Sequence, residues 1–337
     1  MKAVAYYQSL PSSDPQSLQD IELPAPTPGP RDLLVAVRAI SVNPVDTKIR
    51  SNVAPADGQA KVLGWDVAGV VQAVGSAVSL FQVGDEVFYA GALQRQGGNS
   101  ELHVVDERIV GHKPTRLGFA EAAALPLTAI TAWELLFERL KIAEGSTSSG
   151  QSLLIIGAAG GVGSILTQLA RQLTGLTVIG TASRPETADW VKQLGAHHVI
   201  DHSQPLLAQL QQLGIQQVDH VASLTHTDLH YDQLIEALAP QGQLALIDDP
   251  AQLDVVKLKR KSLSLHWEFM YTRSLFETPD MQAQHALLEQ VAQLIDAGTL
   301  RTTLGEHFGS INASNLRRAH TLLESGKARG KIVLEGF

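Results

Sequence analysis

The sequence contains no cysteine among its 337 residues. This absence excludes disulfide bonds, a thiolate nucleophile, cysteine-ligated zinc and iron–sulfur clusters. A chain without disulfides is typical of reducing compartments, so we expect a cytoplasmic protein.

Long apolar runs and basic runs are also missing. No apolar run approaches the roughly 20 residues of a transmembrane helix. The polar, proline-rich sequence after Tyr7 begins too early for the apolar region of a signal peptide. The chain has 26 basic and 34 acidic residues, a net charge of −8, and no basic run stands out. We therefore expect no membrane partner and no nucleic-acid partner.

Two catalytic patterns are absent as well. None of the five tyrosines has a lysine four residues later, so the Tyr-x-x-x-Lys pair of short-chain reductases is missing. His226 and His230 stand four residues apart but lack the glutamate of the His-Glu-x-x-His zinc motif. We expect these histidines to be polar surface residues rather than metal ligands.

The chain length suggests about two domains, and the two parts of the sequence differ in pattern. The first third carries short β-type runs separated by glycine and proline, which predicts a β-barrel-like domain. These runs are residues 4–7, 33–40, 67–74, 86–89 and 102–105. Helices are expected at 119–125 and 129–140, followed by a polar connection at 144–151.

Beyond residue 151 apolar strands alternate with helices, which predicts βαβ units and a parallel sheet covered on both faces. Strands are expected at 152–157, 176–181, 198–201, 218–223, 243–247 and 262–269, and helices at 161–174, 185–194, 205–213, 230–239 and 251–259. Six strands at this spacing match a complete doubly wound dinucleotide-binding domain. Two further helices, 280–297 with Asp280 as N-cap and Gly298 as C-cap, and 313–324, precede a strand at 331–334.

A glycine-rich loop follows the first of these strands. Read from Ala158, it is a variant Ala-x-Gly-x-x-Gly of the dinucleotide fingerprint, with Gly160 and Gly163 at the second and third positions. Gly160 would let the backbone approach a pyrophosphate, and Gly163 would let the helix pack closely on the strand. The N-terminus of that helix favours a phosphate, because its N–H groups and its dipole attract negative charge.

The end of the second strand indicates which dinucleotide binds. An NAD site places a carboxylate there, about 20 residues after the glycine loop, to hold the ribose 2′-hydroxyl. This chain has Ser183 and Arg184 instead, a hydroxyl and a guanidinium that suit a 2′-phosphate. We therefore expect NADPH as the cofactor.

With these motifs the sequence resembles the medium-chain dehydrogenase/reductase superfamily, in its zinc-independent quinone oxidoreductase branch, over nearly its whole length. The resemblance rests on Ser-Val-Asn-Pro-Val-Asp-Thr-Lys (41–48), Gly-Trp-Asp-Val-Ala-Gly-Val-Val (64–71), Val-Gly-Asp-Glu-Val (83–87), Leu-Pro-Leu-Thr-Ala-Ile-Thr-Ala (125–132), Ala-Ala-Gly-Gly-Val-Gly (158–163), Leu-Gly-Ala (194–196) and Gly-Lys-Ile-Val-Leu (330–334). It implies an α/β fold: a Rossmann domain with a doubly wound six-stranded parallel sheet, at 123–269, and a mostly β, barrel-like (GroES-like) substrate domain, at 1–122 and 270–337.

The resemblance also bears on zinc. Zinc-dependent relatives bind the catalytic metal with a cysteine, the histidine of a Gly-His-Glu motif and a second cysteine. Asn43, Trp65 and Leu127 stand at those positions here. An amide, an indole and an aliphatic side chain do not form a zinc site, so no metal is expected.

Without zinc to ionise an alcohol, the resemblance implies hydride transfer from NADPH to a quinone. The alternative acceptor is the activated C=C bond of an enone or alkenal. Negative charge then builds on a carbonyl oxygen that needs a donor, and the catalytic candidates are Asn43, Lys48 and Asp46. Lys48 stands where relatives often have tyrosine. Asp46 either holds the geometry of its loop, makes a hydrogen bond on the cofactor side, or caps a helix.

The resemblance further implies residues around the cofactor and the substrate. The cofactor-binding candidates are Thr131, Ala159, Gly160, Gly161, Val162, Gly163, Ser183, Arg184, His202, Leu224, Ile247, Phe269 and Lys331. The substrate-lining candidates are Trp65, Tyr89 and Trp267, and the loop at 91–101 is expected to edge the active-site cleft. His202 would take the place of a tyrosine that relatives often carry beside the 2′-phosphate.

The resemblance implies a homodimer, and the partner molecule is a small quinone or enone. A third interpretation, which the acidic balance and the missing basic patch disfavour, is a non-catalytic NADPH-binding protein, crystallin-like or RNA-binding.

Overall fold

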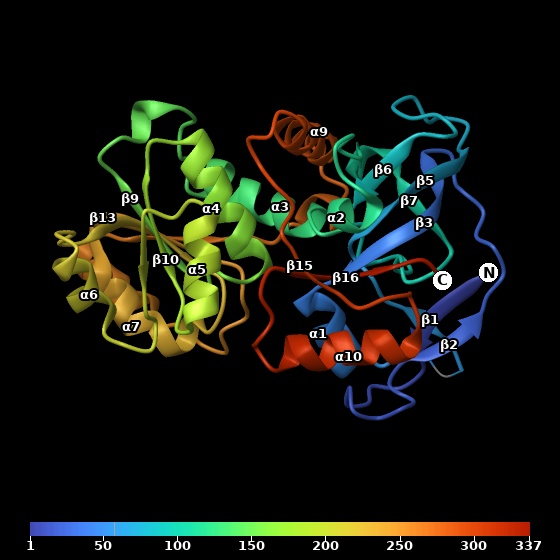
Figure 1. Ribbon diagram of the computed structural model, residues 1–337, viewed down its shortest axis with the longest axis horizontal. Helices are drawn as coiled ribbons and strands as arrows, with labels where there is room; N and C mark the ends of the chain where they lie inside the picture. Colours follow the sequence, from blue (N-terminus) through green and yellow to red (C-terminus); the bar gives the residue numbers. More distant parts are fainter. Residues whose placement is uncertain (57) are drawn as a thin grey trace. The chain divides into compact units, whose positions relative to one another are not determined.

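The computed structural model describes residues 1–56 and 58–337. The chain forms two compact units, each described here by itself (Figure 1). Unit 1 contains Met1–Ile130 and Tyr271–Phe337, and unit 2 contains Thr131–Met270. The boundaries expected from the sequence, after residues 122 and 269, lie before these. Both chain ends belong to unit 1.

Unit 2 contains one six-stranded sheet in which every pairing is parallel. Its strands are β9 (Ser152–Ile156), β10 (Thr177–Thr181), β11 (His198–Ile200), β12 (Val218–Ser223), β13 (Leu238–Leu246) and β14 (Ser264–Trp267). The spatial order is β11-β10-β9-β12-β13-β14. Numbered from β9, this is 3-2-1-4-5-6, the order of the Rossmann fold. The predicted doubly wound sheet is therefore confirmed.

Helices cover the sheet of unit 2. They are α4 (Gly161–Leu173), α5 (Pro185–Gln193), α6 (Leu206–Gln212) and α7 (Thr227–Ala237), with a 3₁₀ segment η4 (Val255–Lys261) before β14. α4 packs on β9 and β10, and α7 packs on β12, β13 and α6. Both faces of the strands are thus buried, which explains why β9 is apolar at nearly every position. η4 replaces the α-helix expected at 251–259.

Unit 1 is built around one long strand, β3 (Asp32–Val42), which pairs with β5, β7 and β16. Its other strands are β1 (Lys2–Tyr6), β2 (Gln19–Glu22), β4 (Lys61–Val62), β5 (Val67–Val74), β6 (Glu86–Tyr89), β7 (Leu102–Asp106), β8 (Val110–His112), β15 (Leu304–His307) and β16 (Lys331–Glu335). β1, β2 and β4 form a separate three-stranded sheet. The mostly β unit expected from the first third of the chain is confirmed.

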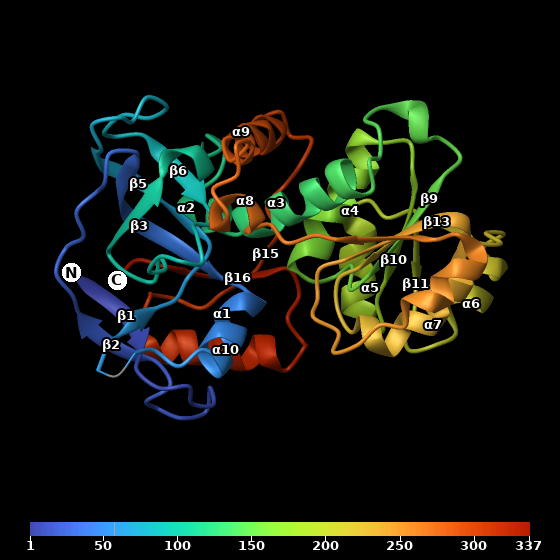
Figure 2. The ribbon, with the colours of Figure 1, turned by 180° about the vertical axis from the view of Figure 1, so that it is seen from behind.

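The last fifth of the chain completes unit 1. β16 pairs antiparallel with β3, Ile332 opposite Val42. The helices of unit 1 are α1 (Pro44–Asn52), α2 (Phe119–Ala123), α8 (Thr272–Leu275), α9 (Ala283–Asp296), α10 (Ala313–Glu324) and the 3₁₀ turn η1 (Glu107–Ile109). α9 packs on β8, and α10 packs on α1 (Figure 2).

Two local expectations differ from the structure. Residues 44–52 form helix α1, which the sequence pattern did not predict. Asp280 is not the N-cap of α9, because Gln282 occupies that position and Asp280 accepts a hydrogen bond from Arg273 Nε at 3.0 Å. Gly298 follows α9 with φ +75°, which is the left-handed conformation expected of a terminating glycine.

One helical stretch, Phe119–Arg139, is long and apolar enough to cross a membrane by length and composition alone. It joins α2, α3 (Pro126–Trp133) and the π-helical turn η2 (Glu134–Arg139). The sequence has no unbroken apolar run of this length, because charged residues and short breaks interrupt the stretch. Of its most apolar window, 78% is buried inside the fold, as in the core helix of a folded protein.

Candidate functional site

The glycine-rich loop of unit 2 links β9 to the N-terminus of α4. Gly157 has φ +79°, and its N–H donates to Thr181 Oγ1 at 3.1 Å, which ties the loop to the end of β10. A Cβ atom added to Gly163 would lie 2.4 Å from the carbonyl oxygen of Gly157. Glycine is therefore required at position 163 for α4 to pack this closely on the strand.

Gly160 is different. A Cβ atom there would meet only the Gly157 carbonyl oxygen, at 3.4 Å. Packing within the described chain therefore does not require glycine at this position. The half-buried Gly160, Gly161 and Val162 form the first turn of α4, beside the buried Ala159. The first N–H groups of a helix have no partner inside it, so this turn is suited to an anion.

The end of β10 carries no carboxylate. Ser183 is exposed, and Arg184 is the N-cap residue of α5. Arg184 Nε lies 3.4 Å from Glu186 Oε1, with the arginine side chain 40% exposed. The first acidic residue after the strand, Glu186, is therefore inside α5 and faces the guanidinium.

The other cofactor candidates of unit 2 lie at its strand ends. Leu224 and Ile247, both half-buried, follow β12 and β13, and Phe269, 47% exposed, comes two residues after β14. The N–H of Leu224 donates to Ile156 O at 3.3 Å. Thr131 is buried in α3, at the first position of unit 2. The carboxyl ends of parallel strands share one edge of the sheet, which is where nucleotides bind in this fold.

In unit 1 the catalytic candidates surround the start of α1. Asn43 is the N-cap residue, and its backbone N–H donates to Asp46 Oδ2 at 2.7 Å. Asp46 Oδ1 accepts the backbone N–H of Gly64 at 2.8 Å. Asp46 therefore occupies the N3 position of a capping box and also fixes the loop before β5.

Asp66 and Lys331 complete this buried cluster. Lys331 Nζ donates to Asp66 Oδ2 at 2.9 Å, to Val42 O at 3.0 Å and to Asn43 Oδ1. Asn43 Nδ2 donates to Asp66 Oδ2 at 2.8 Å and to Trp65 O at 3.1 Å. Leu127 N–H donates to Asp66 Oδ1 at 2.7 Å. We call Asn43, Asp46, Asp66 and Lys331 the polar cluster of unit 1.

Burial dominates the electrostatics of the polar cluster. It raises the pKa of Asp46 to about 7, although the N–H groups of Asn43 and Gly64 and the charge of Lys331 oppose the shift. Burial likewise raises the pKa of Asp66, opposed first by the Lys331 ammonium and then by the Leu127 N–H. Each carboxyl group thus depends on its hydrogen bonds to remain inside the fold.

Comparison with known proteins agrees with this architecture. Residues 29–133 match the alcohol dehydrogenase GroES-like domain, and residues 194–334 match the zinc-binding dehydrogenase family. A zinc-type alcohol dehydrogenase-like protein of Staphylococcus aureus is 41% identical over 99% of both chains. A quinone oxidoreductase of Pseudomonas aeruginosa is 34% identical over 95% of this chain and 96% of that one. The chain belongs to the medium-chain dehydrogenase/reductase superfamily, in its quinone oxidoreductase branch.

Solved structures of this superfamily superimpose over the whole chain. A Rhizobium etli protein named after zinc-dependent alcohol dehydrogenases is 56% identical, with a TM-score of 0.96 over 100% of this chain and 98% of that one. A mycobacterial protein solved in complex with NADPH is 28% identical, with a TM-score of 0.84 over 99% of both chains. This medium-chain dehydrogenase/reductase is therefore an oxidoreductase of Rossmann plus GroES-like fold.

Zinc, which several of these names imply, does not fit the side chains present here. Of the three residues at the metal positions, Asn43 is occupied by Asp66 and Lys331, and Trp65 Nε1 donates to Ala92 O at 3.3 Å. Leu127 offers no donor atom from its side chain. The Lys331 ammonium lies within the same cluster and would repel a cation. Among residues 1–56 and 58–337 no three His, Asp or Glu side chains cluster as metal ligands.

Several expected roles change with this geometry. A lysine has three N–H donors and an asparagine amide has two, and Lys331 and Asn43 use all of theirs inside unit 1. The expected cofactor contact of Lys331 and the expected oxyanion contact of Asn43 are therefore disfavoured. Both residues hold the loop instead. Lys48 is the exposed member of the three catalytic candidates.

Two substrate-lining candidates are core residues. Trp65 is 1% exposed and Tyr89 is 0% exposed, with Tyr89 Oη 2.9 Å from His103 Nδ1. Tyr89 lies on β6, and Trp65 lies in the loop before β5. Both aromatic rings fill the interior of unit 1, so the expectation that they line a substrate site is corrected. Trp267, at the end of β14, is 51% exposed in unit 2.

Asp66 was missed as a site residue, although the sequence contains a signal for it. It is a single charge within the apolar run 62–71. A carboxylate in such a run is almost never buried without a partner. The identity of that partner was not visible, because Lys331 lies 265 positions further along the chain.

Unit 2 contains a second buried group of charges. Arg139 Nε binds Glu268 Oε2 at 2.7 Å, and Arg139 Nη2 lies 3.8 Å from Glu134 Oε2. Burial raises the pKa of Glu268, opposed by hydrogen bonding to Glu134 and by the charge of Arg139. The π-helical turn η2 brings Glu134 and Arg139 to this position, and the sequence pattern did not predict it.

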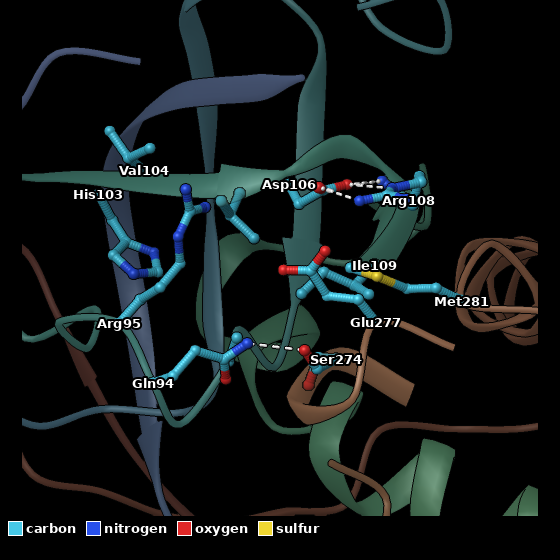
Figure 3. Close-up of a pocket in the computed structure, with 12 residues that line it drawn as sticks. Gln94, Arg95, His103, Val104, Asp106, Arg108, Ile109, Ser274, Glu277 and Met281 are labelled. Atoms are coloured by element: carbon cyan, nitrogen blue, oxygen red, sulfur yellow. Dashed lines mark hydrogen bonds and ion pairs between the residues drawn. The ribbon is translucent and has the colours of Figure 1, made fainter. Parts of the chain in front are cut away.

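A cavity of about 130 Å³ lies within unit 1 (Figure 3). Gln94 and Arg95, from the loop at 91–101, line one side, and Gln94 Nε2 donates to Ser274 O at 2.7 Å. Arg95 binds Asp32 through two hydrogen bonds, and Arg108 binds Asp106 in the same way. Both guanidinium groups are therefore already paired with carboxylates, and the cavity does not present a site for an anion.

Proposed function

We propose that this medium-chain dehydrogenase/reductase transfers a hydride from NADPH to a quinone without zinc. The observation that carries the proposal is the nucleotide-binding edge of unit 2. There the glycine loop between β9 and α4 is followed by Ser183 and Arg184 where an NAD site has a carboxylate. The Pseudomonas aeruginosa relative and the NADPH complex of the mycobacterial relative support it.

In this proposal the N-terminal turn of α4 holds the pyrophosphate, and Ser183 and Arg184 hold the 2′-phosphate. Thr131 and the residues that follow β12, β13 and β14 surround the nicotinamide end. Arg184 keeps its guanidinium near the end of β10 because Glu186 faces it. A 2′-phosphate would compete with this partly exposed pair, which is weak in water.

When bound, NADPH supplies the hydride, which carries two electrons to the quinone. A proton must then reach the quinone oxygen as its charge develops. Lys48, exposed on α1, is our candidate donor, because Asn43 and Lys331 have no remaining N–H groups. The polar cluster of unit 1 holds α1, and with it Lys48, in place.

The test is the absorbance of reduced nicotinamide with purified protein, NADPH or NADH, and either a simple quinone or a simple enone. Each pair is measured with and without a chelator. Faster oxidation of NADPH than of NADH with the quinone, unaffected by chelator, is the expected result. Preference for the enone would indicate that the enzyme is an alkene reductase. Loss of activity with chelator would overturn the zinc-free mechanism.

The role of Lys48 has its own variant. Lys48→Gln should lower kcat with the quinone about 10²-fold, the lower end for a general acid, while NADPH binding is retained. The matched control is Lys2→Gln, which changes an exposed lysine on β1. Equal kcat in both variants would remove Lys48 from the mechanism and make solvent the proton source.

A further inference from the structure

An open groove lies along helix α10 of unit 1, and we call it the α10 groove. Its volume is about 580 Å³, which is within the usual range for pockets that hold small organic molecules. Its lining includes Phe308, Arg317, Arg318, Leu322 and Lys327. Among the described residues that line it, three are cationic and none is acidic, although the chain has a net charge of −8.

Arg317 is held in the groove without a carboxylate. Its Nη1 donates to Pro15 O at 3.0 Å and to Leu18 O at 2.6 Å, so the loop between β1 and β2 fixes the guanidinium beside α10 (Figure 1). A guanidinium has five N–H groups, and these two bonds leave three. Within residues 1–56 and 58–337 no carboxylate forms an ion pair with Arg317. Its charge is therefore not neutralised by a partner.

Arg318 is positioned by an aromatic ring. Its guanidinium carbon lies 4.9 Å from the ring centroid of Phe308, and its Nη1 donates to Asn315 Oδ1 at 3.1 Å. Stacking on a ring restricts the long side chain and leaves most of its N–H groups available. In the part of the chain that the structure describes, Arg318 has no carboxylate partner either.

This pair is unusual within unit 1. Arg95, Arg108 and Arg273 each bind a carboxylate at 2.8–3.0 Å. In the groove, two neighbouring guanidinium groups are instead fixed by carbonyl groups and by a ring. Like charges held side by side repel each other, and an anion between them would remove that repulsion.

Two carboxylates beside α10 are already engaged elsewhere. Glu324 binds Arg50 of α1 and accepts a hydrogen bond from Ser12 Oγ at 2.5 Å. Asp20 Oδ1 accepts the N–H of Ala313, in the first turn of α10, at 2.8 Å. Neither carboxylate is paired with an arginine of the groove.

The chemistry of the groove selects a small anion with an apolar part. A guanidinium fork matches the oxygen atoms of a phosphate group and binds them through charge-assisted hydrogen bonds. Phe308 and Leu322, both half-buried, offer apolar surface in the same groove. The net charge of −8 disfavours a nucleic acid or an anionic membrane as the occupant.

We propose that the α10 groove binds a small organic phosphate, with its phosphate group on Arg317 and Arg318 and its apolar part on Phe308 and Leu322. Because both guanidinium groups are anchored before the ligand arrives, binding costs little side-chain entropy. The groove belongs to unit 1, whereas the nucleotide-binding edge belongs to unit 2. The inference therefore does not rest on the proposed function.

The probes are phenyl phosphate and inorganic phosphate, which differ in the apolar part. Their dissociation constants are measured by phosphorus NMR titration of the whole protein at pH 8, where the phosphate is a dianion. Phenyl phosphate should bind about tenfold more tightly, the effect of covering about 50 Å² of apolar surface. About 0.5 M salt should weaken the binding of both probes, because the groove is open to solvent.

The variants Arg317→Gln and Arg318→Gln should each weaken the binding of both probes about tenfold, the effect of losing one hydrogen bond between charged groups. Phe308→Ala should reduce the advantage of phenyl phosphate to below about threefold. The matched control is Arg260→Gln, which changes an exposed arginine on η4 in unit 2 and should leave both affinities unchanged. Circular dichroism shows whether each variant is folded.

Three outcomes would overturn the inference. The first is unchanged affinity in Arg318→Gln, which decides even if Arg317→Gln disturbs the loop that it holds, because Arg318 is exposed. The second is equal affinity of the wild type for the two probes. The third is a loss of binding in Arg184→Gln without a loss in the groove variants, because the phosphate would then lie at the nucleotide-binding edge.

Discussion

The polar cluster of unit 1 and the nucleotide-binding edge of unit 2 differ in how completely their buried polar groups are hydrogen-bonded. In the polar cluster, every donor of Lys331 and of the Asn43 amide has an acceptor inside the fold. At the edge, His202 and His230 keep buried nitrogen atoms unpaired within the described residues. Fully hydrogen-bonded groups maintain the shape of a loop, whereas a buried polar atom without a partner costs free energy.

Replacing Lys331 with methionine should have the largest effect. It leaves Asp66 buried without its cation, and removing one partner of a buried ion pair costs about 3–5 kcal/mol of unfolding free energy. Urea denaturation followed by circular dichroism measures this loss. The double variant Lys331→Met with Asp66→Asn should recover part of it. A loss below about 1 kcal/mol would place the ion pair in water rather than in the interior.

Gly163→Ala should have the next largest effect on stability. The added Cβ would lie 2.4 Å from Gly157 O, so α4 must move, at a cost of about 1–3 kcal/mol. Gly160→Ala is the matched control, because its Cβ meets only Gly157 O at 3.4 Å. Thermal unfolding should separate the two variants, while NADPH binding should weaken in both. Equal stability losses would contradict the assignment of close packing to Gly163 alone.

Arg184→Ala should alter cofactor choice rather than folding. Loss of one charge-assisted contact to the 2′-phosphate lowers the preference for NADPH over NADH about tenfold, which is about 1.4 kcal/mol. The ratio of kcat/KM for the two cofactors is the measurement. Arg171→Ala, in the last turn of α4, is the control and should leave the ratio unchanged. An unchanged ratio in Arg184→Ala would remove this residue from cofactor recognition.

Asp46→Asn should differ from the wild type in the pH dependence of stability rather than by one fixed loss. The pKa of Asp46 is about 7 in the fold and near 4 when unfolded, so the folded state holds a proton that the unfolded chain releases. Stability from this group is present below pH 4 and is lost as the pH rises to 7. Relative to Asp46→Asn, the wild-type unfolding free energy should fall by about 1 kcal/mol per pH unit in that window. If the unfolding free energies of the wild type and of Asp46→Asn changed with pH in parallel, Asp46 would be ionised throughout this pH range.

Local patterns in the sequence were enough to predict most of unit 2. β12 occupies the expected residues 218–223, and α4 begins at Gly161 as expected. The reason is that a buried parallel strand and its following helix carry their own apolar periodicity and turn residues. Unit 1 was harder to predict, since β3 pairs with strands from three separate parts of the chain.

The candidate site shows the same contrast between local patterns and long-range contacts. The glycine loop and Arg184 could be proposed as cofactor contacts from the sequence, because the fingerprint lies within one βαβ unit. Asn43, Asp46 and Lys331 were separate candidates, but their grouping around Asp66 was not predicted, because its hydrogen bonds join residues up to 289 positions apart. The contact between the His202 and His230 rings depends on how two loops fold at one edge of the sheet, and no spacing in the sequence predicts it.

The return of β16 to β3 sets an order of folding. Unit 2 is one uninterrupted segment, so it can fold as soon as its residues have left the ribosome. Unit 1 cannot close until Lys331, near the end of synthesis, reaches Asp66. Until then the carboxylate and the open edge of β3 stay in solvent, and contacts of such long sequence separation form slowly. Refolding experiments should therefore show unit 2 acquiring structure first, with the polar cluster as the last step.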